Sequence, residues 1–311
     1  MKTLVAGGAG FIGSHLIDAL LAKGHQVVCI DNLSLGTKEN IVHLQNNDAF
    51  TFYEMDICNQ EKLEKILVEE QIEYIFHLAA NSDIQQSAKN PQVEFQNTYS
   101  TTYYLLEAAR KSNIKKFFFA STSAVYGDKK DELLDENTAN LSPISYYGGS
   151  KLGSEALISA FCYMNDMQVL IFRFPNVIGP RLTHGVIHDF IGGLQQNPQE
   201  LVILGNGQQT KPYVYVLDLI DAIIKFMDVK EKGITLYNVG VETATSVTRI
   251  ADIICEEMKL KDVKYNYTGG EGGWKGDVPR FQYSLKKIHD AGWKANYTSE
   301  EAVRLTVQKN L

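Results

Sequence analysis

The sequence predicts an α/β fold, in which a doubly wound parallel sheet carries a smaller, interleaved α/β lobe. Apolar, strand-like runs alternate with helical patterns through the first half of the 311-residue chain. A glycine-rich turn follows the first of these runs directly. The run Phe117-Phe118-Phe119 suits a strand that is covered on both faces. Alternation of this kind is typical of βαβ units and therefore of a parallel sheet.

The predicted elements divide at Pro175, after which the regular alternation is lost. Before it we expect strands at 2–6, 26–30, 50–53, 74–80, 116–120 and 169–174, and helices at 14–23, 60–70, 92–112 and 147–163. After it we expect helices at 186–196, 219–227, 246–258 and 298–308, and strands at 201–204, 213–216 and 234–239. Asp218 stands where it would cap the helix at 219–227. No linker separates the halves, so we expect two interleaved domains. The first comprises residues 1–174 and also receives about 212–240, and the second is a lobe formed mainly by residues 175–311.

Residues 1–31 contain the most specific motif. The strand at 2–6 leads into Gly7-Gly8-Ala9-Gly10-Phe11-Ile12-Gly13, then a helix, then a second strand that ends in Asp31. This order is the dinucleotide-binding fingerprint in its required context, and it makes the predicted sheet Rossmann-type. Gly7 permits the tight turn, Gly10 lets a pyrophosphate approach the backbone, and Gly13 permits close helix packing. The helix N-terminus favours phosphate groups.

The acid at the end of the second strand indicates which dinucleotide binds. Asp31 would accept hydrogen bonds from a ribose that carries free hydroxyls, and it would repel a 2′-phosphate. The predicted cofactor is therefore NAD, in preference to NADP.

Composition excludes several classes of partner. The formal net charge of −7 gives no support for binding nucleic acid or an anionic membrane surface. No segment approaches eighteen uninterrupted apolar residues, so no transmembrane helix is expected. The four cysteines are widely spaced and form no metal or disulfide pattern: Cys29, Cys58, Cys162 and Cys255. With no signal peptide before the first strand, we expect a cytoplasmic protein with reduced thiols.

Tyr147 and Lys151 are the strongest candidates for chemistry. Residues four apart share one face of a helix, so the lysine ammonium would lower the pKa of the tyrosine and favour the phenolate. Such a tyrosine can act as a general base near neutral pH. The hydroxyls of Ser121-Thr122-Ser123 follow the strand at 116–120, at the sheet edge where ligands bind. On spacing alone, a packed tyrosine beside a solvated lysine remains the alternative.

With these motifs in order, the chain resembles the extended short-chain dehydrogenases/reductases of the nucleotide-sugar epimerase/dehydratase family, in particular UDP-glucose 4-epimerase-like members. The resemblance covers essentially the full length. It rests on the glycine turn and on the following segments: Asp31-Asn32-Leu33-Ser34, Asp56-Ile57, His77-Leu78-Ala79-Ala80, Ser-Thr-Ser-Ala-Val-Tyr-Gly at 121–127, Tyr147 with Lys151, Asn176-Val177-Ile178-Gly179-Pro180-Arg181, and Tyr213-Val214-Tyr215-Val216.

The resemblance implies a role for each matching residue. Tyr147 would take the proton from a sugar 4-hydroxyl, assisted by Thr122, with Ser123 as the alternative hydroxyl. Lys151 would lower the tyrosine pKa and hold the nicotinamide ribose. The implied cofactor-binding residues are Gly7, Gly10, Phe11, Ile12, Asp31, Asn32, Ser34, Asp56, Ile57, Leu78, Ala79, Ala80, Asn97, Tyr147 and Lys151. The implied substrate-binding residues are Thr122, Asn176, Arg181, Lys211 and Trp274, most of them in the predicted substrate-binding lobe.

Departures from the family pattern narrow the implied reaction. The 4,6-dehydratases carry an Asp-Glu pair after the active-site threonine, and nucleotide-sugar decarboxylases have glutamate at the second of these positions. This chain has Ser123 and Ala124 there. The implied reaction is epimerisation at C4 of a UDP-hexose through a 4-keto intermediate. A C4 dehydrogenase or 4-keto reductase with net redox, and a non-catalytic NAD-binding protein, remain the alternatives.

Other departures concern the substrate and the assembly. Lys211 and Trp274 stand where relatives often have arginines, which grip a diphosphate in a way that lysine cannot. The segment 183–189 contains two histidines and an aspartate, but loop histidines are common and no metal is expected. The family also implies a homodimer through the helices at 92–112 and 147–163. Tyr99, Tyr103, Ile158 and Phe161 would supply apolar surface there, or else belong to the core.

Overall fold

The computed structural model describes residues 1–228 and 232–311, apart from the side chains of Gln85 and Gln86. The chain forms two compact units that alternate along the sequence. The first contains residues 1–125, 146–173 and 220–237, and the second contains 126–145, 174–219 and 238–311. We expected segment 126–145 in the first domain, but it groups with the second unit. Its Tyr126 hydroxyl lies 2.9 Å from the Asp135 carbonyl and 2.7 Å from Asn238 Oδ1, both in the second unit.

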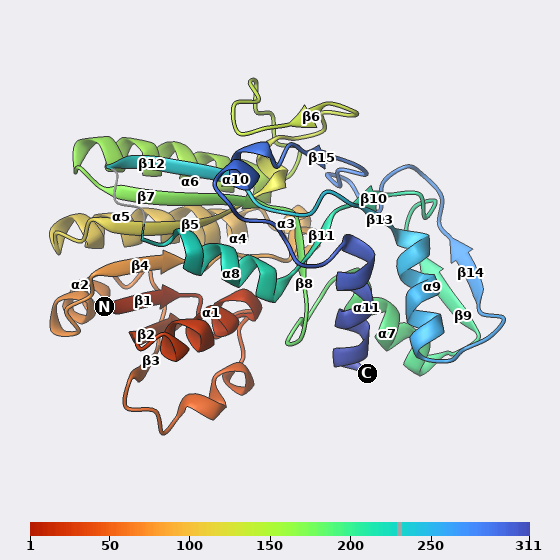
Figure 1. Ribbon diagram of the computed structural model, residues 1–311, viewed down its shortest axis with the longest axis horizontal. Helices are drawn as coiled ribbons and strands as arrows, with labels where there is room; N and C mark the ends of the chain where they lie inside the picture. Colours follow the sequence, from red (N-terminus) through yellow and green to blue (C-terminus); the bar gives the residue numbers. More distant parts are fainter. Residues whose placement is uncertain (229–231) are drawn as a thin grey trace. The chain divides into compact units, whose positions relative to one another are not determined.

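A seven-stranded sheet forms the centre of the first unit, in the order β12-β7-β5-β4-β1-β2-β3 (Figure 1). The strands are β1 (Lys2–Ala6), β2 (Gln26–Asp31), β3 (Phe50–Glu54), β4 (Tyr74–His77), β5 (Lys116–Thr122), β7 (Gln168–Phe174) and β12 (Gly233–Asn238). The β1–β2, β2–β3, β1–β4 and β4–β5 pairs are all parallel. The order reverses beside β1, which confirms the doubly wound prediction and places a ligand crevice at the carboxyl ends there.

Helices cover both faces of this sheet, with α1 and α8 in front and α2, α5 and α6 behind in Figure 1. Their bounds are α1 (Phe11–Ala22), α2 (Gln60–Glu69), α3 (Ile84–Lys89), α4 (Gln92–Glu94), α5 (Thr101–Lys111), α6 (Tyr146–Met164) and α8 (Val216–Phe226). The helix expected at 92–112 forms, but Phe95–Ser100 within it adopts a π-helical turn. Such turns are rare and frequently lie at functional sites.

One core of the first unit lies between the sheet and the α2, α5 and α6 layer. It is built from alternate strand residues such as Leu4, Val28 and Phe117, against Leu105 and Ile158 of the helices. Alternate residues of a strand face the same side of the sheet, so the positions of the apolar side chains determine which helices the strand packs against. Ile158 is fully buried here, so it belongs to the core and not to an exposed apolar face.

The second unit is built from short strand pairs and three longer helices. Its helices are α7 (Val186–Gln196), α9 (Val247–Glu257), the short α10 (Lys286–Asp290) and α11 (Ser299–Asn310). Its strands are β6 (Leu133–Leu134), β8 (Asn176–Ile178), β9 (Glu200–Ile203), β10 (Thr210–Lys211), β11 (Tyr213–Tyr215), β13 (Thr245–Ser246), β14 (Lys264–Tyr267) and β15 (Gln282–Tyr283). A separate apolar core includes Ile187, Ile203, Ile250 and Val303.

Side chains at the expected helix starts cap α9 and α11, whereas α8 lacks the cap that we expected. Ser246 caps α9 by accepting from the Arg249 amide, and Thr298 with Glu301 forms a capping box on α11. Asp218 is not the cap that we expected, because α8 begins earlier, at Val216. The Asp218 carboxylate instead accepts hydrogen bonds from Asn296, from its amide at 3.0 Å and its Nδ2 at 2.6 Å. Among the described residues, no helix has the length and apolar character needed to cross a bilayer.

The glycines of the first turn make a stability prediction. A Cβ on Gly13 would lie 2.2 Å from the Gly7 carbonyl oxygen, whereas a Cβ on Gly192 of α7 meets no atom within 4 Å. Gly13→Ala should lower the free energy of unfolding by about 1–3 kcal/mol, because neighbouring backbone must shift. Gly192→Ala should raise it by about 0.5–1 kcal/mol through helix propensity. Urea denaturation would measure both, and equal effects of the two substitutions would contradict the close approach at Gly13.

Candidate active site

The glycine turn lies against the segment that follows β4, at a distance that only glycine permits. Gly7 has a φ of 79°, and a Cβ on it would lie 2.6 Å from the Ala79 amide nitrogen. Its own amide donates to the Ile30 carbonyl at 2.8 Å. A Cβ on Gly10, in contrast, would come within 4 Å only of the Gly7 carbonyl oxygen, at 3.2 Å. The space over Gly10 is therefore open, as a pyrophosphate would require.

Asp31 is buried at the end of β2 and already holds this turn. Its Oδ2 accepts from the Ala9 amide at 3.0 Å, and its Oδ1 accepts from the Leu33 amide at 2.8 Å. Burial raises the pKa of Asp31, and the backbone hydrogen bonds oppose that rise. Asn40, which the sequence analysis missed, donates from Nδ2 to the Ala9 carbonyl at 2.9 Å. Asp31 and Asn40 thus fix the turn from both sides of Ala9.

The remaining cofactor candidates lie around the same carboxyl ends. Leu78, Ala79 and Ala80 are partly exposed directly after β4, beside Gly7. Ile57 is buried, while Asp56 is exposed and accepts from the Cys58 amide at 2.7 Å. Asn32 and Ser34 are exposed after Asp31.

The start of α1 fits a dinucleotide phosphate. The helix begins directly after Gly10, and none of the described side chains caps it or places an acid in its first turn. Its first amides and positive dipole end are therefore left for an anion.

Thr122, Tyr147 and Lys151 come together at the end of β5. Lys151 is buried on α6, and its Nζ donates to the Ala120 carbonyl at 2.7 Å. The same Nζ lies 4.7 Å from the centroid of the Phe119 ring and 5.9 Å from that of Tyr147. Tyr147 is hydrogen-bonded to the Thr122 side chain, whose Oγ1 also accepts from the Ala124 amide at 3.2 Å. The predicted base, its assisting hydroxyl and its lysine therefore form one cluster.

The electrostatics of this cluster differ from our expectation. We expected Lys151 to lower the pKa of Tyr147, but burial raises that pKa and the charge of Glu94 raises it further. The hydrogen bond with Thr122 acts in the opposite direction. Burial also lowers the pKa of Lys151 to about 8, while the carboxylates of Glu94 and Glu155 raise it. In this structure the phenol is therefore the favoured form of Tyr147.

Glu94 is a buried residue of the site that motif reasoning did not identify. Its Oε1 accepts from Asn81 Nδ2 at 2.8 Å, and its Oε2 accepts from the Thr98 hydroxyl at 2.7 Å. Thr98 also accepts from the Asn81 amide at 3.1 Å, so the π-helical turn is joined to the loop after β4. Thr98 is fully buried, whereas the predicted Asn97 is only partly so.

The substrate candidates other than Thr122 belong to the second unit. Lys211 Nζ binds Asp277 Oδ1 at 2.5 Å and lies 5.4 Å from the Trp274 ring centroid. The indole Nε1 of Trp274 is buried and has no hydrogen-bond partner among the described residues. Asn176 is exposed at the start of β8, which pairs in parallel with β11, and Arg181 follows β8 with a φ of 67°. Lys211, Trp274 and Asp277 thus form one group, with the lysine charge already paired.

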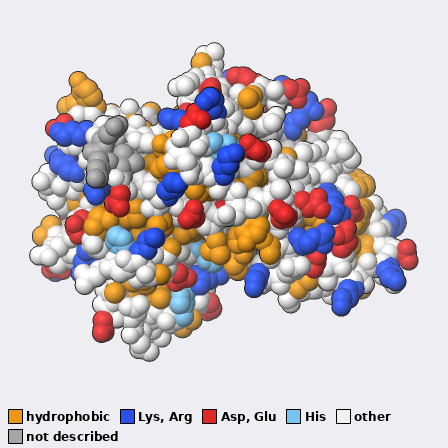
Figure 2. All heavy atoms as spheres, in the orientation of Figure 1, with side chains coloured by type: hydrophobic (Ala, Val, Ile, Leu, Met, Phe, Trp, Pro, Cys, Tyr) orange, Lys and Arg blue, Asp and Glu red, His pale blue; other side chains and the backbone are white. Residues whose placement is uncertain are grey.

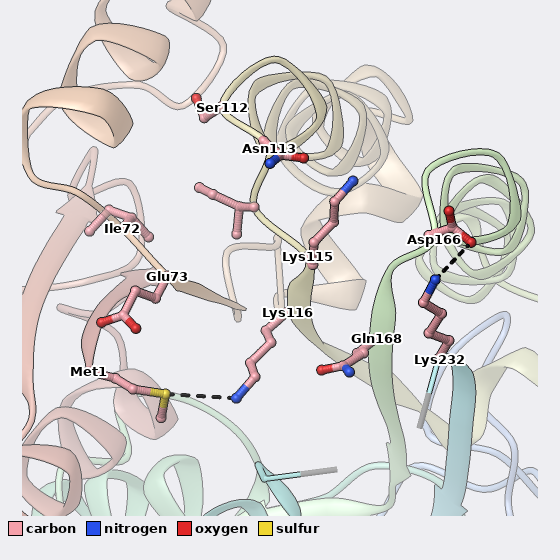
Figure 3. Close-up of a pocket in the computed structure, with 11 residues that line it drawn as sticks. Met1, Ile72, Glu73, Ser112, Asn113, Lys115, Lys116, Asp166, Gln168 and Lys232 are labelled. Carbon is pink, nitrogen blue, oxygen red and sulfur yellow. Dashed lines mark hydrogen bonds and ion pairs between the residues drawn. The ribbon is translucent and has the colours of Figure 1, made fainter. Parts of the chain in front are cut away.

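A shallow pocket lies at the opposite edge of the sheet and is not the site (Figure 3). It is lined by residues at the amino ends of strands, including Glu73, Lys116 and Gln168. Lys116 reaches the Met1 sulfur at 3.9 Å and Lys232 pairs with Asp166 at 3.4 Å, as Figure 3 shows. The carboxyl ends of the parallel strands lie at the other edge of the sheet, and so does the cluster around Lys151.

Surface charge and metal-ligating groups add no further site. The face drawn in Figure 2 carries acidic and basic side chains intermixed. Within residues 1–228 and 232–311, no group of three or more His, Cys, Asp or Glu side chains is arranged to hold a metal ion.

Comparison with known proteins agrees with this geometry. The NAD dependent epimerase/dehydratase family matches residues 3–240. A UDP-glucose 4-epimerase of Mycolicibacterium smegmatis is 31% identical, covering 99% of this chain and 98% of its own length. A dTDP-D-glucose 4,6-dehydratase of Mus musculus is 29% identical, covering 99% of this chain and 88% of its own length.

A solved structure is similar over the same extent. The UDP-glucuronic acid 4-epimerase from Bacillus cereus, in complex with UDP-glucuronic acid and NAD, matches with a TM-score of 0.90 at 29% identity. The match covers 99% of this chain and 98% of that one. The chain therefore belongs to the NAD dependent epimerase/dehydratase family, as its motifs indicated, and NAD is its cofactor.

Proposed function

We propose that the protein is an NAD-dependent epimerase that inverts C4 of a UDP-linked hexose through a transient 4-keto sugar. One observation carries this choice within the family. Thr122, Tyr147 and Lys151 lie together, as oxidation at C4 would require, whereas Ser123 and Ala124 after the threonine supply no acid or base. Removing water from C5 and C6 needs such groups, and epimerisation does not. The UDP-sugar ligands of its epimerase relatives support the choice of nucleotide.

The chain's own residues would perform the proton transfers. Tyr147 takes the proton of the 4-hydroxyl as C4 becomes a carbonyl, and the Thr122 hydroxyl binds the same oxygen. When bound, NAD supplies the hydride acceptor and a positive charge that favours the Tyr147 phenolate. The 4-keto sugar then presents its other face, and Tyr147 returns the proton as C4 is reduced. The cycle leaves no net redox change.

Binding residues divide between the two units in this proposal. Residues 1–125 with 146–173 would hold NAD through the glycine turn, Asp31, Asp56 and Lys151. The second unit would hold the substrate through Asn176, Arg181 and Lys211. The indole N–H of Trp274, which has no hydrogen-bond partner among the described residues, would donate to it.

The reaction is tested by incubating the purified protein with UDP-, GDP- and dTDP-hexoses and recording the products by NMR. We expect interconversion of gluco and galacto isomers of a UDP-sugar, with constant absorbance in the NADH band. A steady change in that band would indicate a C4 dehydrogenase or 4-keto reductase instead. A 4-keto-6-deoxy product would indicate a dehydratase, and absence of the galacto isomer from every UDP-hexose would refute the proposal.

Tyr147→Phe tests the base. Turnover should fall by roughly 10²–10⁴-fold, because proton transfer at the 4-hydroxyl loses its acceptor. The neighbouring Tyr146 is 55% exposed, and Tyr146→Phe is the matched control that should retain activity. Both variants, purified without added NAD, should release NAD on denaturation, because the cycle regenerates it in place. Full activity in Tyr147→Phe would contradict the role of Tyr147 as the base.

A homodimer is proposed through the helical layer that contains α5 and α6. Aromatic side chains gather there: Phe95 and Tyr99 stack at 6.0 Å, and Tyr103 meets Phe161 edge-on at 6.4 Å. Phe95 and Tyr103 are exposed in the single chain, at 59% and 43%. Exposed clusters of this kind mark protein–protein surfaces.

Tyr103→Asp should convert a dimer to a monomer at micromolar concentration, because it places a charge in an apolar contact. Light scattering would measure the molecular mass. Tyr267→Asp is the control, since Tyr267 in the second unit is 44% exposed and lies outside the cluster. A wild-type monomer, or dissociation by both substitutions alike, would count against this interface.

A further inference from the structure

Helix α6 is joined to the end of β5 at three neighbouring residues. Tyr147, Lys151 and Glu155 follow one another at four-residue intervals along the helix, so they share a face. Lys151 Nζ binds the Ala120 carbonyl at 2.7 Å, and Glu155 Oε1 accepts from the Ser121 hydroxyl at 2.5 Å. Tyr147 is hydrogen-bonded to Thr122. The catalytic lysine and tyrosine therefore belong to a longer series that Glu155 completes.

Glu155 also binds the next strand, through Arg173 near the end of β7. Arg173 Nε donates to Glu155 Oε1 at 3.0 Å, and its Nη2 donates to Oε2 at 2.6 Å. Both side chains are more than nine-tenths buried. A bidentate pair of this kind fixes orientation as well as distance. The proposed reaction assigns no role to either residue.

The charges around Lys151 come from the elements packed against it. From β4, His77 is neutral because burial and the lysine charge hold its pKa well below the usual range. The remaining groups are the Glu94 carboxylate of α4, Tyr147 and the Glu155 carboxylate of α6, and Arg173 of β7, which is bound by Glu155. Glu94 and Glu155 are therefore the two counter-charges of the buried ammonium, and only Glu155 is also fixed to a strand end beside it.

We propose that Glu155 is a positioning residue of the reaction: bound to Ser121 and Arg173, it holds Lys151 against the end of β5 and supplies its counter-charge. This inference rests on the proposed function for its kinetic consequences. Its effect on Lys151 rests on the attachment of both side chains to the end of β5, together with the Glu155 carboxylate raising the Lys151 pKa. Glu155→Gln keeps the shape of the side chain and removes its charge.

The direct test is an NMR titration of the lysine ¹³Cε signals in the NAD-bound protein, with Lys151→Met identifying the signal of Lys151. Without the Glu155 charge, the Lys151 pKa should fall by about one unit in Glu155→Gln. If kcat falls at alkaline pH as Lys151 loses its proton, that fall should move to lower pH by a similar interval in Glu155→Gln. kcat at neutral pH should drop by about tenfold, with KM within twofold.

Two further variants separate charge from attachment and from general destabilisation. Ser121→Ala leaves the Glu155 charge in place, so kcat should fall several-fold with no shift in the Lys151 titration. Glu257→Gln removes a similar pair in the second unit, where Glu257 binds Arg304 at 2.5 Å and Gln308 at 3.1 Å. Neither kcat nor the Lys151 titration should change in that control.

An unchanged Lys151 titration in folded Glu155→Gln would overturn the inference, as would a lower kcat whose pH dependence stays in place. If Glu155→Gln does not fold, the double variant Glu155→Leu/Arg173→Met replaces the buried pair by apolar side chains, which proteins often tolerate. A smaller fall in the Lys151 pKa is expected of it, because the Arg173 charge is removed as well, and an unchanged kcat in this variant overturns the inference equally. A shifted titration without turnover of any UDP-sugar would refute the proposed function and leave the role of Glu155 standing.

Discussion

The buried ammonium of Lys151 constrains much of the structure around it. An amine that is withdrawn from water loses its hydration, and the fold must replace that hydration with dipoles and opposite charges. The Ala120 carbonyl, the Phe119 ring and the carboxylates of Glu94 and Glu155 supply these replacements. Because the lysine lies in contact with the end of β5, anything that shifts that strand end also shifts Lys151 and the neighbouring Tyr147 and Thr122.

The two carboxylates do not act alike on the neighbouring tyrosine. Glu94 raises the pKa of both Tyr147 and Lys151, whereas Glu155 raises the pKa of Lys151. The Glu94 charge therefore favours the protonated forms of Tyr147 and Lys151 alike. Burial, with the charge of Glu94 added to it, keeps Tyr147 as a phenol in this structure. This burial explains why the spacing of Tyr147 and Lys151 is insufficient to predict the direction of the tyrosine pKa.

Local motifs allowed the fold and the centre of the site to be predicted from the sequence. The glycine turn, Asp31 and the Tyr147–Lys151 spacing each depend on residues that are close in the chain, so their physical reasons are readable there. Glu94 and Asn40 depend on partners across loops, and no periodic pattern marks them. Glu155 did have a signal, because it continues the four-residue spacing, but its partners Ser121 and Arg173 lie on strands far away in sequence. Asp218 shows the opposite error, since a residue suited to capping was used for a tertiary contact.

The π-helical turn at Phe95–Ser100 makes the number of residues in this helix part of the site. A π turn accommodates one more residue than the α-helical turns around it, so removing one residue would let the segment relax to ordinary α-helix. The side chains before and after the turn would keep nearly the same relative orientation, because the wide turn had taken up the extra residue, but the local bulge between them would be lost. Glu94 lies before the turn, and the fully buried Thr102, bound to His77 and Ser154, lies after it. A one-residue deletion between Phe95 and Ser100 should therefore disturb the fully buried Thr98 within the turn more than the orientation of Glu94 relative to Thr102.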